Sequence, residues 1–385
     1  MNTSCTTHTH LADSRAAGEA LGREIATAFA GESPDAVVVF ASSRYHHQEL
    51  LQSITDTCHP KILVGSSSAG EFTQNSFEDG AACAMAFRSD EMQFSAGIGR
   101  SLHADRCIAA RSIVDSFTGM KSRAHPYRSA LIMTDALAGH ADDFVEQLTL
   151  MTGGTYKLFG GGAGDDAQFR KTHVFFGTEA VPDAAVSLEI LSRKPIGVGV
   201  CHGWEPTGIP YRVTAAEGMR LVSLNAMSAR EVFCEHAVAT GQILDVANPI
   251  PFFLHNVIGI STDSGFRLRV PLSIEKDGSI TCAADIPEGA MVYLMKPQQL
   301  SALEATKGAL AQLGENKPKA AIFFDCVATR LRMGKEFGFE IQAVEKALGP
   351  GTSFAGCNTY GQIARADGQF NGFHNCTAVV CVFPE

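Results

Sequence analysis

Apolar runs that alternate with amphipathic segments set the pattern of the chain from residue 35 onward. The run at 37–42 predicts a strand, YHHQELLQSITDTC has the period of a helix, and KILVGSSSAGEF predicts a strand that runs into a glycine turn. GAACAMAFRSD and MQFSAGIG predict two more strands. The stretch is therefore a β-α-β-turn-β unit.

The unit recurs twice along the chain. The second copy has a strand at 129–135, a helix in HADDFVEQLTLMTG and a strand with its turn in YKLFGGGAGDD. The third has a strand at 319–327, a helix in GFEIQAVEKALG and a strand with its turn in SFAGCNTYGQIA. We expect an α/β fold with mixed sheets, in two domains built from repeated β-α-β-β units with helices packed on the sheets.

Three regions are expected along the chain. Residues 1–34 comprise a polar tail, solvated over its first ten residues, and a helix at about 12–30. The first domain spans 35–205 and the second 206–385, because a cluster of proline and glycine near 205 is typical of a domain boundary.

The glycine turns GSSSAGEF, GGGAGDDA and GCNTYGQI occupy the same place in the three copies. Two of them have the G-x4-G spacing of a phosphate-binding loop, but Glu71 and Gln362 stand where such a loop needs a lysine. Glycines that are retained while the side chains change indicate a backbone requirement, either a positive φ or a close approach of two chain segments. We therefore interpret the turns as structural.

Charge and cysteine content narrow the classes of function. A net charge of −10 with scattered Lys and Arg predicts neither a nucleic-acid partner nor an anionic membrane surface. Eleven cysteines without a C-x-x-C pair are typical of reduced thiols in a cytosol. The N-terminus lacks the apolar core of a signal peptide, and no apolar run has the length of a membrane span. We expect a cytoplasmic protein.

Several stretches, in this order, resemble the FIST family, which pairs a FIST N domain with a FIST C domain in bacterial sensory proteins. They are ILVGSSSAGEF, LFGGGAGDDAQFRKTHVFFGTEAVPDAAVSLEIL, GVCHGWEPTG, LVSLNAMSAREVF, IPEGAMVYLM, FFDCVATR and SFAGCNTYGQIARADGQFNGFHNCTAVVCVF. The resemblance covers nearly all of residues 35–385. It implies a FIST N-type domain at 35–205 and a FIST C-type domain at 206–385.

A two-domain FIST chain of this length is similar to the FIST haemoproteins that sense nitric oxide. This resemblance implies non-covalent haem b as cofactor, nitric oxide as ligand and a histidine kinase as the regulated partner. The oligomeric state is left open between a monomer and a homodimer. The alternative is a FIST sensor of a non-haem metabolite, such as an amino acid, in the same interdomain site.

Haem held without covalent attachment needs an apolar pocket, an axial donor and an open distal side. His374 lies between phenylalanines in FNGFHNCT, His202 follows a strand in VCHGWEPTG, and His236 has apolar residues three and four positions before it on a helix. A cysteine thiolate at 201 or 234 is the rival donor. The expected cofactor-binding residues are His236, His202, His374, Trp204, Phe373 and Asn375, with the three histidines as candidate iron ligands.

A metal-dependent enzyme is a further alternative. Asp142, Asp143, Asp165 and Asp166 have the chemistry to hold Mg²⁺, and Cys326 beside a histidine would form a nucleophile pair. The first two aspartates also suit the first turn of a helix, and the other two suit a turn. Because no motif couples a nucleophile to a base, we expect a non-catalytic protein.

Overall fold

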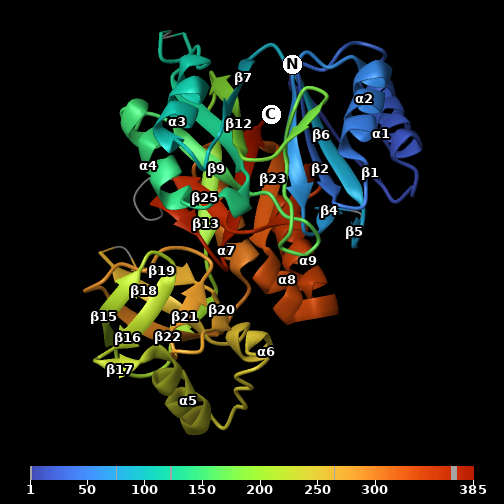
Figure 1. Ribbon diagram of the computed structural model, residues 1–385. Coiled ribbons are helices and arrows are strands. Elements are labelled where there is room, and N and C mark those ends of the chain that lie inside the picture. The colour runs from blue at the N-terminus through green and yellow to red at the C-terminus, as the bar shows by residue number, and fades with distance from the viewer. Residues whose placement is uncertain (1, 75, 122–123, 264, 366–370) are drawn as a thin grey trace.

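The computed structural model describes residues 2–74, 76–121, 124–263, 265–365 and 371–385; residues 366–370 of the last resembling stretch lie outside it. The chain forms a large α/β body and a smaller β-rich domain, with both termini at the end of the large body farthest from the small domain (Figure 1). The expected fold class is confirmed, since mixed sheets with helices packed on them form two domains. Within the described ranges, no helix is both long enough and apolar enough to cross a membrane.

Three repeats make up the large body. The first comprises β1 (Asn2–Thr9), α1 (Ser14–Ala28), β2 (Ala36–Ser42), α2 (His47–Cys58), β3 (Leu63–Ser68), β4 (Glu71–Thr73), β5 (Ser76–Glu78) and β6 (Ala82–Ser89). The second comprises β7 (Met92–Arg100), α3 (Arg106–Asp115), β8 (Tyr127–Thr134), the short 3-10 helix η1 (Ala136–Ala138), α4 (Ala141–Met151), β9 (Lys157–Gly162), β10 (Val174–Phe176), β11 (Glu179–Val181) and β12 (Ala184–Ser192). The third comprises β13 (Gly197–Cys201), α7 (Ser301–Ala311), β23 (Pro318–Cys326), α8 (Val327–Met333), the 3-10 helix η2 (Gly334–Phe337), α9 (Gly338–Leu348), β24 (Ser353–Thr359), β25 (Gln362–Arg365), β26 (Asn371–His374) and β27 (Ala378–Pro384).

The small domain is inserted into the third repeat, between β13 and α7. The expected boundary at 205 falls inside its first strand, and the chain returns to the large body after Pro297. Its elements are β14 (Trp204–Pro206), β15 (Tyr211–Glu217), β16 (Arg220–Leu224), β17 (Met227–Ser228), α5 (Ala229–Thr240), α6 (Ile250–Phe253), β18 (Val257–Thr262), β19 (Gly265–Arg269), β20 (Pro271–Ile274), β21 (Ile280–Cys282) and β22 (Met291–Pro297), and the strands form one sheet.

The N-terminal residues differ from the sequence-based expectation. The prediction of a solvated tail is wrong, because β1 pairs with β6 along its whole length, from Asn2 opposite Ser89 to Thr9 opposite Ala82. Thr7 and Thr9 are buried, as the alternation of a strand requires. A polar segment is ordered here because the edge of β6 supplies backbone partners.

The three sheets of the large body have the same strand order, and each receives a hairpin from another repeat. The shared part of the order is β1-β6-β2-β3 in the first sheet, β7-β12-β8-β9 in the second and β13-β27-β23-β24 in the third. Hairpin β4–β5 joins β24, β10–β11 joins β3, and β25–β26 joins β9. The repeats therefore interlock cyclically, and each sheet depends on another repeat for its last two strands.

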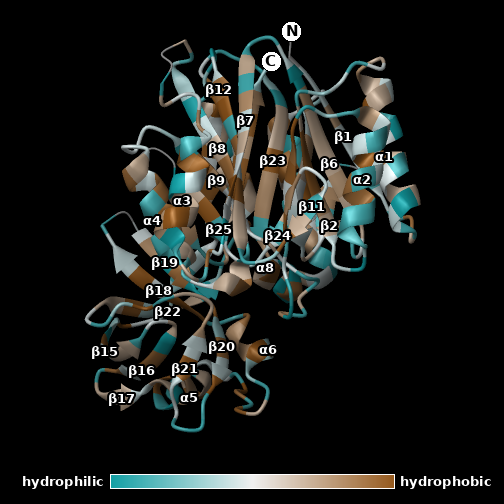
Figure 2. Cartoon of the chain, turned by 45° about the horizontal axis from the view of Figure 1, so that its top comes forward, coloured by the Kyte–Doolittle hydropathy of each residue, from teal (hydrophilic) through white to brown (hydrophobic). Residues whose placement is uncertain are grey.

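The core of the large body lies between the three sheets. One face of each sheet contributes to a shared apolar cluster, which includes Phe40, Phe159 and Phe324 from the three different sheets. The other faces pack against the helix pairs α1 with α2, α3 with α4, and α7 with α9. Because both faces are covered, central strands such as β2, β23 and β27 are apolar along most of their length, and Figure 2 shows β23 as hydrophobic beside the more hydrophilic outer helices.

A glycine stands at the same position in each repeat, where the two parallel central strands approach closely. A Cβ atom at this glycine would lie 1.8, 2.0 or 1.9 Å from the carbonyl oxygen of the residue paired with it. No side chain fits at such a distance, so the expected close approach is present in all three copies. The glycines and their partners are Gly65 with Val39, Gly160 with Ile132, and Gly356 with Phe323.

The three glycine turns meet at one end of the sheets. The Ala69 N–H donates to the carbonyl of Asn358 in the third turn (2.9 Å), and the Gly164 N–H donates to the carbonyl of Ser67 in the first (3.0 Å). Backbone amides that a phosphate-binding loop would offer to its ligand are therefore engaged by neighbouring turns. The structure supports the interpretation of these turns as structural.

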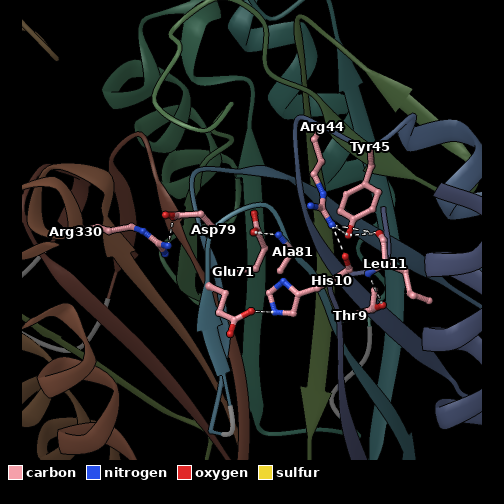
Figure 3. Close-up of polar contacts among 10 residues, drawn as sticks. Thr9, His10, Leu11, Arg44, Tyr45, Glu71, Asp79, Ala81 and Arg330 are labelled. Carbon is pink, nitrogen blue, oxygen red and sulfur yellow. Dashed lines mark hydrogen bonds and ion pairs between the residues drawn. The ribbon is translucent and has the colours of Figure 1, made fainter. Parts of the chain in front are cut away.

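Polar contacts hold hairpin β4–β5 both at its first residue, Glu71, and directly after its end, at Asp79 (Figure 3). Arg330 of α8 pairs with Asp79, which follows the hairpin, and also donates to Asn358 (3.0 Å). At the base of the hairpin, the buried carboxyl of Glu71 accepts the N–H of Ala81 (3.0 Å) and the hydroxyl of Ser68. Burial raises the pKa of Glu71 to about 8, so the neutral acid is the form that the fold favours.

We expect Gly160→Ala to destabilise the protein by about 3 kcal/mol, because the new methyl group would displace the neighbouring strand. The residue also has a φ of +142°, which side chains disfavour. Gly308→Ala in α7 is the control, since its Cβ would meet only the Gly199 Cα at 3.8 Å. Urea unfolding should show a neutral or stabilising effect at 308. Equal effects at the two positions would contradict the assignment.

We expect the stability of the protein to depend on pH through Glu71. Because the pKa is raised in the folded state, that state holds a proton that the unfolded state releases, so Glu71 contributes a loss of stability as the pH rises from 4.5 to 8. The slope approaches about 1.4 kcal/mol per pH unit. Glu71→Gln keeps the hydrogen-bonding shape and removes the titration, so its unfolding free energy should exceed that of the parent increasingly with pH. Parallel curves would contradict this role.

Candidate functional site

A cavity of about 730 Å³ lies between the large body and the inserted domain. The large body contributes the loop before α4, the start of α8 and the turn after β24, and the inserted domain contributes α6, β20 and β21. This volume and the mainly apolar lining are typical of a small-molecule site. The polar groups and rings that matter below are His140, Asp142, Phe169, Cys326, Tyr360 and Asn375.

Two stacked aromatic rings form one side of the cavity. Phe169 lies on Tyr360 with a centroid distance of 4.3 Å and an interplanar angle of 14°. The Tyr360 hydroxyl donates to Asp165, which also accepts the backbone N–H of Phe169 (2.8 Å). Phe169 is 48% exposed although its backbone is held in place. The arrangement offers a flat apolar surface to a ligand.

A buried ion pair joins the two bodies beside the cavity. The Arg269 guanidinium of β19 donates to the Asp142 carboxylate at the start of α4 (2.7 Å), and its side chain is only 2% exposed. Arg269 also donates to the carbonyls of Phe373 (3.2 Å) and Asp285 (2.9 Å). Two of these acceptors, Asp142 and Phe373, belong to the large body, so separating the two bodies would remove them from the buried charge.

Cys326 stands in the wall of the cavity, directly before α8. Its sulfur accepts the thiol of Cys376 and the backbone N–H groups of Cys376 and Ala328. The hydrogen bond from the Cys376 thiol and these amides outweigh burial and lower the pKa of Cys326 to about 6. The same hydrogen bond, together with burial, raises the pKa of Cys376 well above its usual range. At neutral pH the two sulfurs therefore share one proton, which Cys376 holds.

Two of the sequence-predicted residues, Phe373 and Asn375, line the cavity. His374 lies between them on the chain and is 3% exposed. Burial and the nearby Arg267 and Arg269 lower its pKa well below the usual range, so the imidazole is neutral. A neutral imidazole is the form that binds metals, but among the described residues His374 is not part of the cavity lining.

His202 and Trp204 are not among the described residues that line the cavity. His202 is close enough to His374 to affect its titration, and burial lowers its own pKa. Trp204 is 8% exposed and packs in the cluster that contains Val270 and Cys326, with the Arg332 guanidinium 5.5 Å from its ring. The structure therefore places Trp204 beneath the lining rather than at a pocket rim.

His236 lies in the core of the inserted domain. Its Nε2 atom is 2.9 Å from the Asn256 side-chain oxygen, and its ring packs edge-on to Phe252. These contacts give the imidazole a hydrogen-bond partner and an aromatic neighbour within the inserted domain. Iron ligation by His202, His236 or His374 stays a prediction.

The aspartates considered for a metal site have protein partners. Asp142 and Asp143 occupy the first turn of α4, as expected, and Asp143 binds Arg106 (2.8 Å). Asp165 accepts three consecutive backbone N–H groups in its turn. In the part of the chain that the structure describes, no group of three His, Cys, Asp or Glu side chains is placed to hold a metal ion.

Haem b fits the cavity in size and in the apolar character of the lining. Among the described residues, the histidine in the lining is His140, which is exposed and precedes α4 with a φ of +55°. It would hold the iron from the rim, and the stacked pair of Phe169 and Tyr360 offers a surface for the macrocycle. The residues present therefore fit the group.

Sequence reasoning misses the residues that make the cavity distinctive. The pattern around His140 favours a surface or capping role, and nothing local in the sequence distinguishes this histidine from others at helix starts. Phe169 lies within a stretch that resembles the FIST family, but its exposure is visible only in the structure. The sequence-based nucleophile pair joins Cys326 to a histidine, whereas the partner in the structure is Cys376.

Comparison with known proteins places the chain in a family. Residues 35–227 match the FIST N domain and residues 229–365 match the FIST C domain. An uncharacterised protein of Methanocaldococcus jannaschii is 26% identical over 151 residues, a match that covers 37% of this chain and 30% of the archaeal protein. The chain thus spans less than a third of that relative.

Two solved structures give weak matches over the whole chain. A cyanuric acid hydrolase from A. caulinodans aligns with a TM-score of 0.37 at 8% identity, covering 100% of both chains. PurLQS from Thermotoga maritima aligns with a TM-score of 0.24 at 10% identity, covering 99% of this chain and 72% of the other. Both scores are too low to indicate a common fold. FIST domains are associated with small-ligand sensing, and the chain, with its FIST N and FIST C domains, belongs to the FIST family.

Proposed function

We propose that this chain is a non-catalytic sensor whose small ligand binds in the cavity between the large body and the inserted domain. The observation that carries the proposal is that both bodies line this cavity. A ligand in contact with both favours whichever relative placement gives it more contacts, and this differential affinity is what a sensor needs. The Asp142–Arg269 ion pair lies beside the same cavity and links the two bodies.

The ligand class proposed is a flat apolar molecule, and haem b is the member of it that the family resemblance implies. The stacked rings of Phe169 and Tyr360 and the apolar residues of α6 and β20 would bury its faces. When bound, the iron supplies an open coordination position for a diatomic gas. His140 would supply the nitrogen that holds the metal, and the surrounding side chains would exclude water.

The signal proposed is nitric oxide, and the regulated partner proposed is a histidine kinase. Both follow from the resemblance to the nitric-oxide-sensing FIST proteins. Binding of the gas would act on the kinase through the relative placement of the two bodies, since the cavity lies at their junction. The same geometry serves the alternative, in which a non-haem metabolite takes the place of haem.

We expect Phe169→Ala to weaken the affinity for haem b about fivefold, because an aromatic contact contributes about 1 kcal/mol. Titration of the full chain with haem b, followed by its Soret band, measures the dissociation constant. Phe339→Ala is the matched control: this phenylalanine of α9 is similarly exposed, at 54%, and does not line the cavity. If both variants bind haem as the parent does, the ligand does not occupy this cavity.

We expect the reconstituted chain to show a sharp Soret band that shifts with nitric oxide, and one histidine to be required for it. Single alanine variants of His140, His202, His236 and His374 identify the donor, and the cavity lining favours His140. Full haem occupancy with unchanged spectra in all four variants would overturn histidine ligation. A featureless spectrum, together with a melting temperature that rises with an added amino acid, would support the metabolite sensor instead.

A further inference from the structure

Two cysteines that are far apart in the sequence meet in the wall of the cavity. In the antiparallel ladder of β23 with β27, Phe324 is opposite Val379. Cys326 lies two residues after Phe324 and Cys376 lies three residues before Val379, so the ladder brings the two cysteines together. Both belong to the same apolar cluster. Cys326 lines the cavity, so a small reagent inside the cavity lies next to this residue.

Hydrogen bonds from Cys376 and Ala328 favour a negative charge on the Cys326 sulfur. The Cys376 thiol and backbone N–H and the Ala328 N–H all point at the Cys326 sulfur, which stabilises a negative charge there. The thiolate is the reactive form of cysteine, and its low pKa makes it the dominant form at neutral pH. Cys376 keeps its proton in the reduced pair, because its thiol is the hydrogen-bond donor to the Cys326 sulfur.

The backbone at Cys376 is held in an unfavourable conformation. Its φ is +48°, which costs a non-glycine residue about 1–2 kcal/mol. The flanking residues hold it there, because Thr377 donates to the Asn375 carbonyl (2.8 Å) and the Asn375 side chain accepts the Val270 N–H (3.4 Å). Strain that the surroundings maintain is typical of functional positions, and here it presents the Cys376 thiol to Cys326.

A second pair of neighbouring cysteines lacks these features. Cys83 is close enough to Cys357 to raise its pKa, and both lie in the buried core of the large body. Burial raises the pKa of each, and the Cys83 thiol donates to the Gly356 carbonyl. Proximity alone therefore does not produce a thiolate in this protein. The Cys83 and Cys357 thiols are internal controls.

We propose that Cys326 and Cys376 form a redox-active dithiol that reacts with a hydroperoxide entering the interdomain cavity. The Cys326 thiolate attacks the peroxide: a sulfur–oxygen bond forms, the oxygen–oxygen bond breaks, and the leaving oxygen takes a proton to become water or an alcohol. The resulting sulfenic acid condenses with the Cys376 thiol, giving a disulfide and one molecule of water. The two sulfurs lose two electrons in total, and the peroxide gains them.

The disulfide would join the start of α8 to the segment that carries Asn375. Both contribute to the lining of the cavity, so oxidation changes the wall that a ligand meets. The dithiol does not depend on the identity of that ligand. A test on the chain without added haem therefore separates this inference from the proposed function.

The test is peptide mapping of the full chain after reduction, removal of reductant and exposure to hydrogen peroxide. Free thiols are then alkylated, and the protein is digested with trypsin without reduction. We expect peptide 320–330, which carries Cys326, to be joined to peptide 366–385, which carries Cys376, with the loss of two hydrogen atoms. Peptides 62–88 and 347–365, which carry Cys83 and Cys357, should remain fully alkylated.

Three variants assign the sulfurs, and thermal unfolding checks that each is folded. Cys376→Ser should abolish the cross-link and leave a sulfenic acid on Cys326 that dimedone traps, whereas Cys326→Ser should show neither product. Cys381→Ser should keep the cross-link, which separates Cys376 from the other cysteine of the same peptide. The oxidation rate should rise with pH through about 6 and then level.

Full alkylation of Cys326 at a peroxide concentration that oxidises the exposed Cys107 would overturn the proposal. So would a cross-link that survives Cys376→Ser. The parent protein alone decides the first point, so the experiment remains decisive even if a variant fails to fold.

Discussion

The close approach of the parallel central strands at Gly65, Gly160 and Gly356 is the constraint on which the rest of the large body depends. At these positions the carbonyl oxygen of the neighbouring strand occupies the space that a Cβ atom would need. The same three glycines pair on their other side with the hairpin supplied by another repeat. The strand pairs, the exchanged hairpins and the meeting of the three turns are therefore parts of one packing arrangement.

That arrangement also builds half of the candidate site. The turn after β24 carries Tyr360, hairpin β25–β26 carries Phe373, and β23 ends at Cys326 where α8 begins. All three line the cavity, and the hairpin that carries Phe373 joins the sheet of the second repeat. The inserted domain completes the cavity, and the buried Arg269 links it to Asp142 of the second repeat. Such an ion pair adds little net stability, but it disfavours placements that leave either charge unpaired.

The cavity combines two kinds of chemistry. Its apolar lining and stacked rings suit a small-ligand sensor, which agrees with the association of FIST domains with sensing. The Cys326 sulfur in its wall is a separate feature. Hydrogen bonds from Cys376 and Ala328 lower the pKa of this thiol, and the fold brings these donors to it. A molecule that occupies the cavity would lie next to this sulfur, so ligand binding and thiol chemistry share one space.

Local patterns in the chain were sufficient to predict the type of most elements, their threefold recurrence, the structural use of the glycine turns and the family. Each of these is contained in the apolar period or spacing of consecutive residues, which short-range stereochemistry converts into helices, strands and turns. The folded chain was needed to learn that the polar N-terminus is a strand, that the hairpins are exchanged and that the chain returns to the large body after Pro297. The same is true of the cavity, of His140 and Phe169 in its lining, and of the pairing of Cys326 with Cys376. These features depend on contacts between residues tens to hundreds of positions apart, and no local pattern records which distant segment will supply the backbone partner, the opposing charge or the second sulfur.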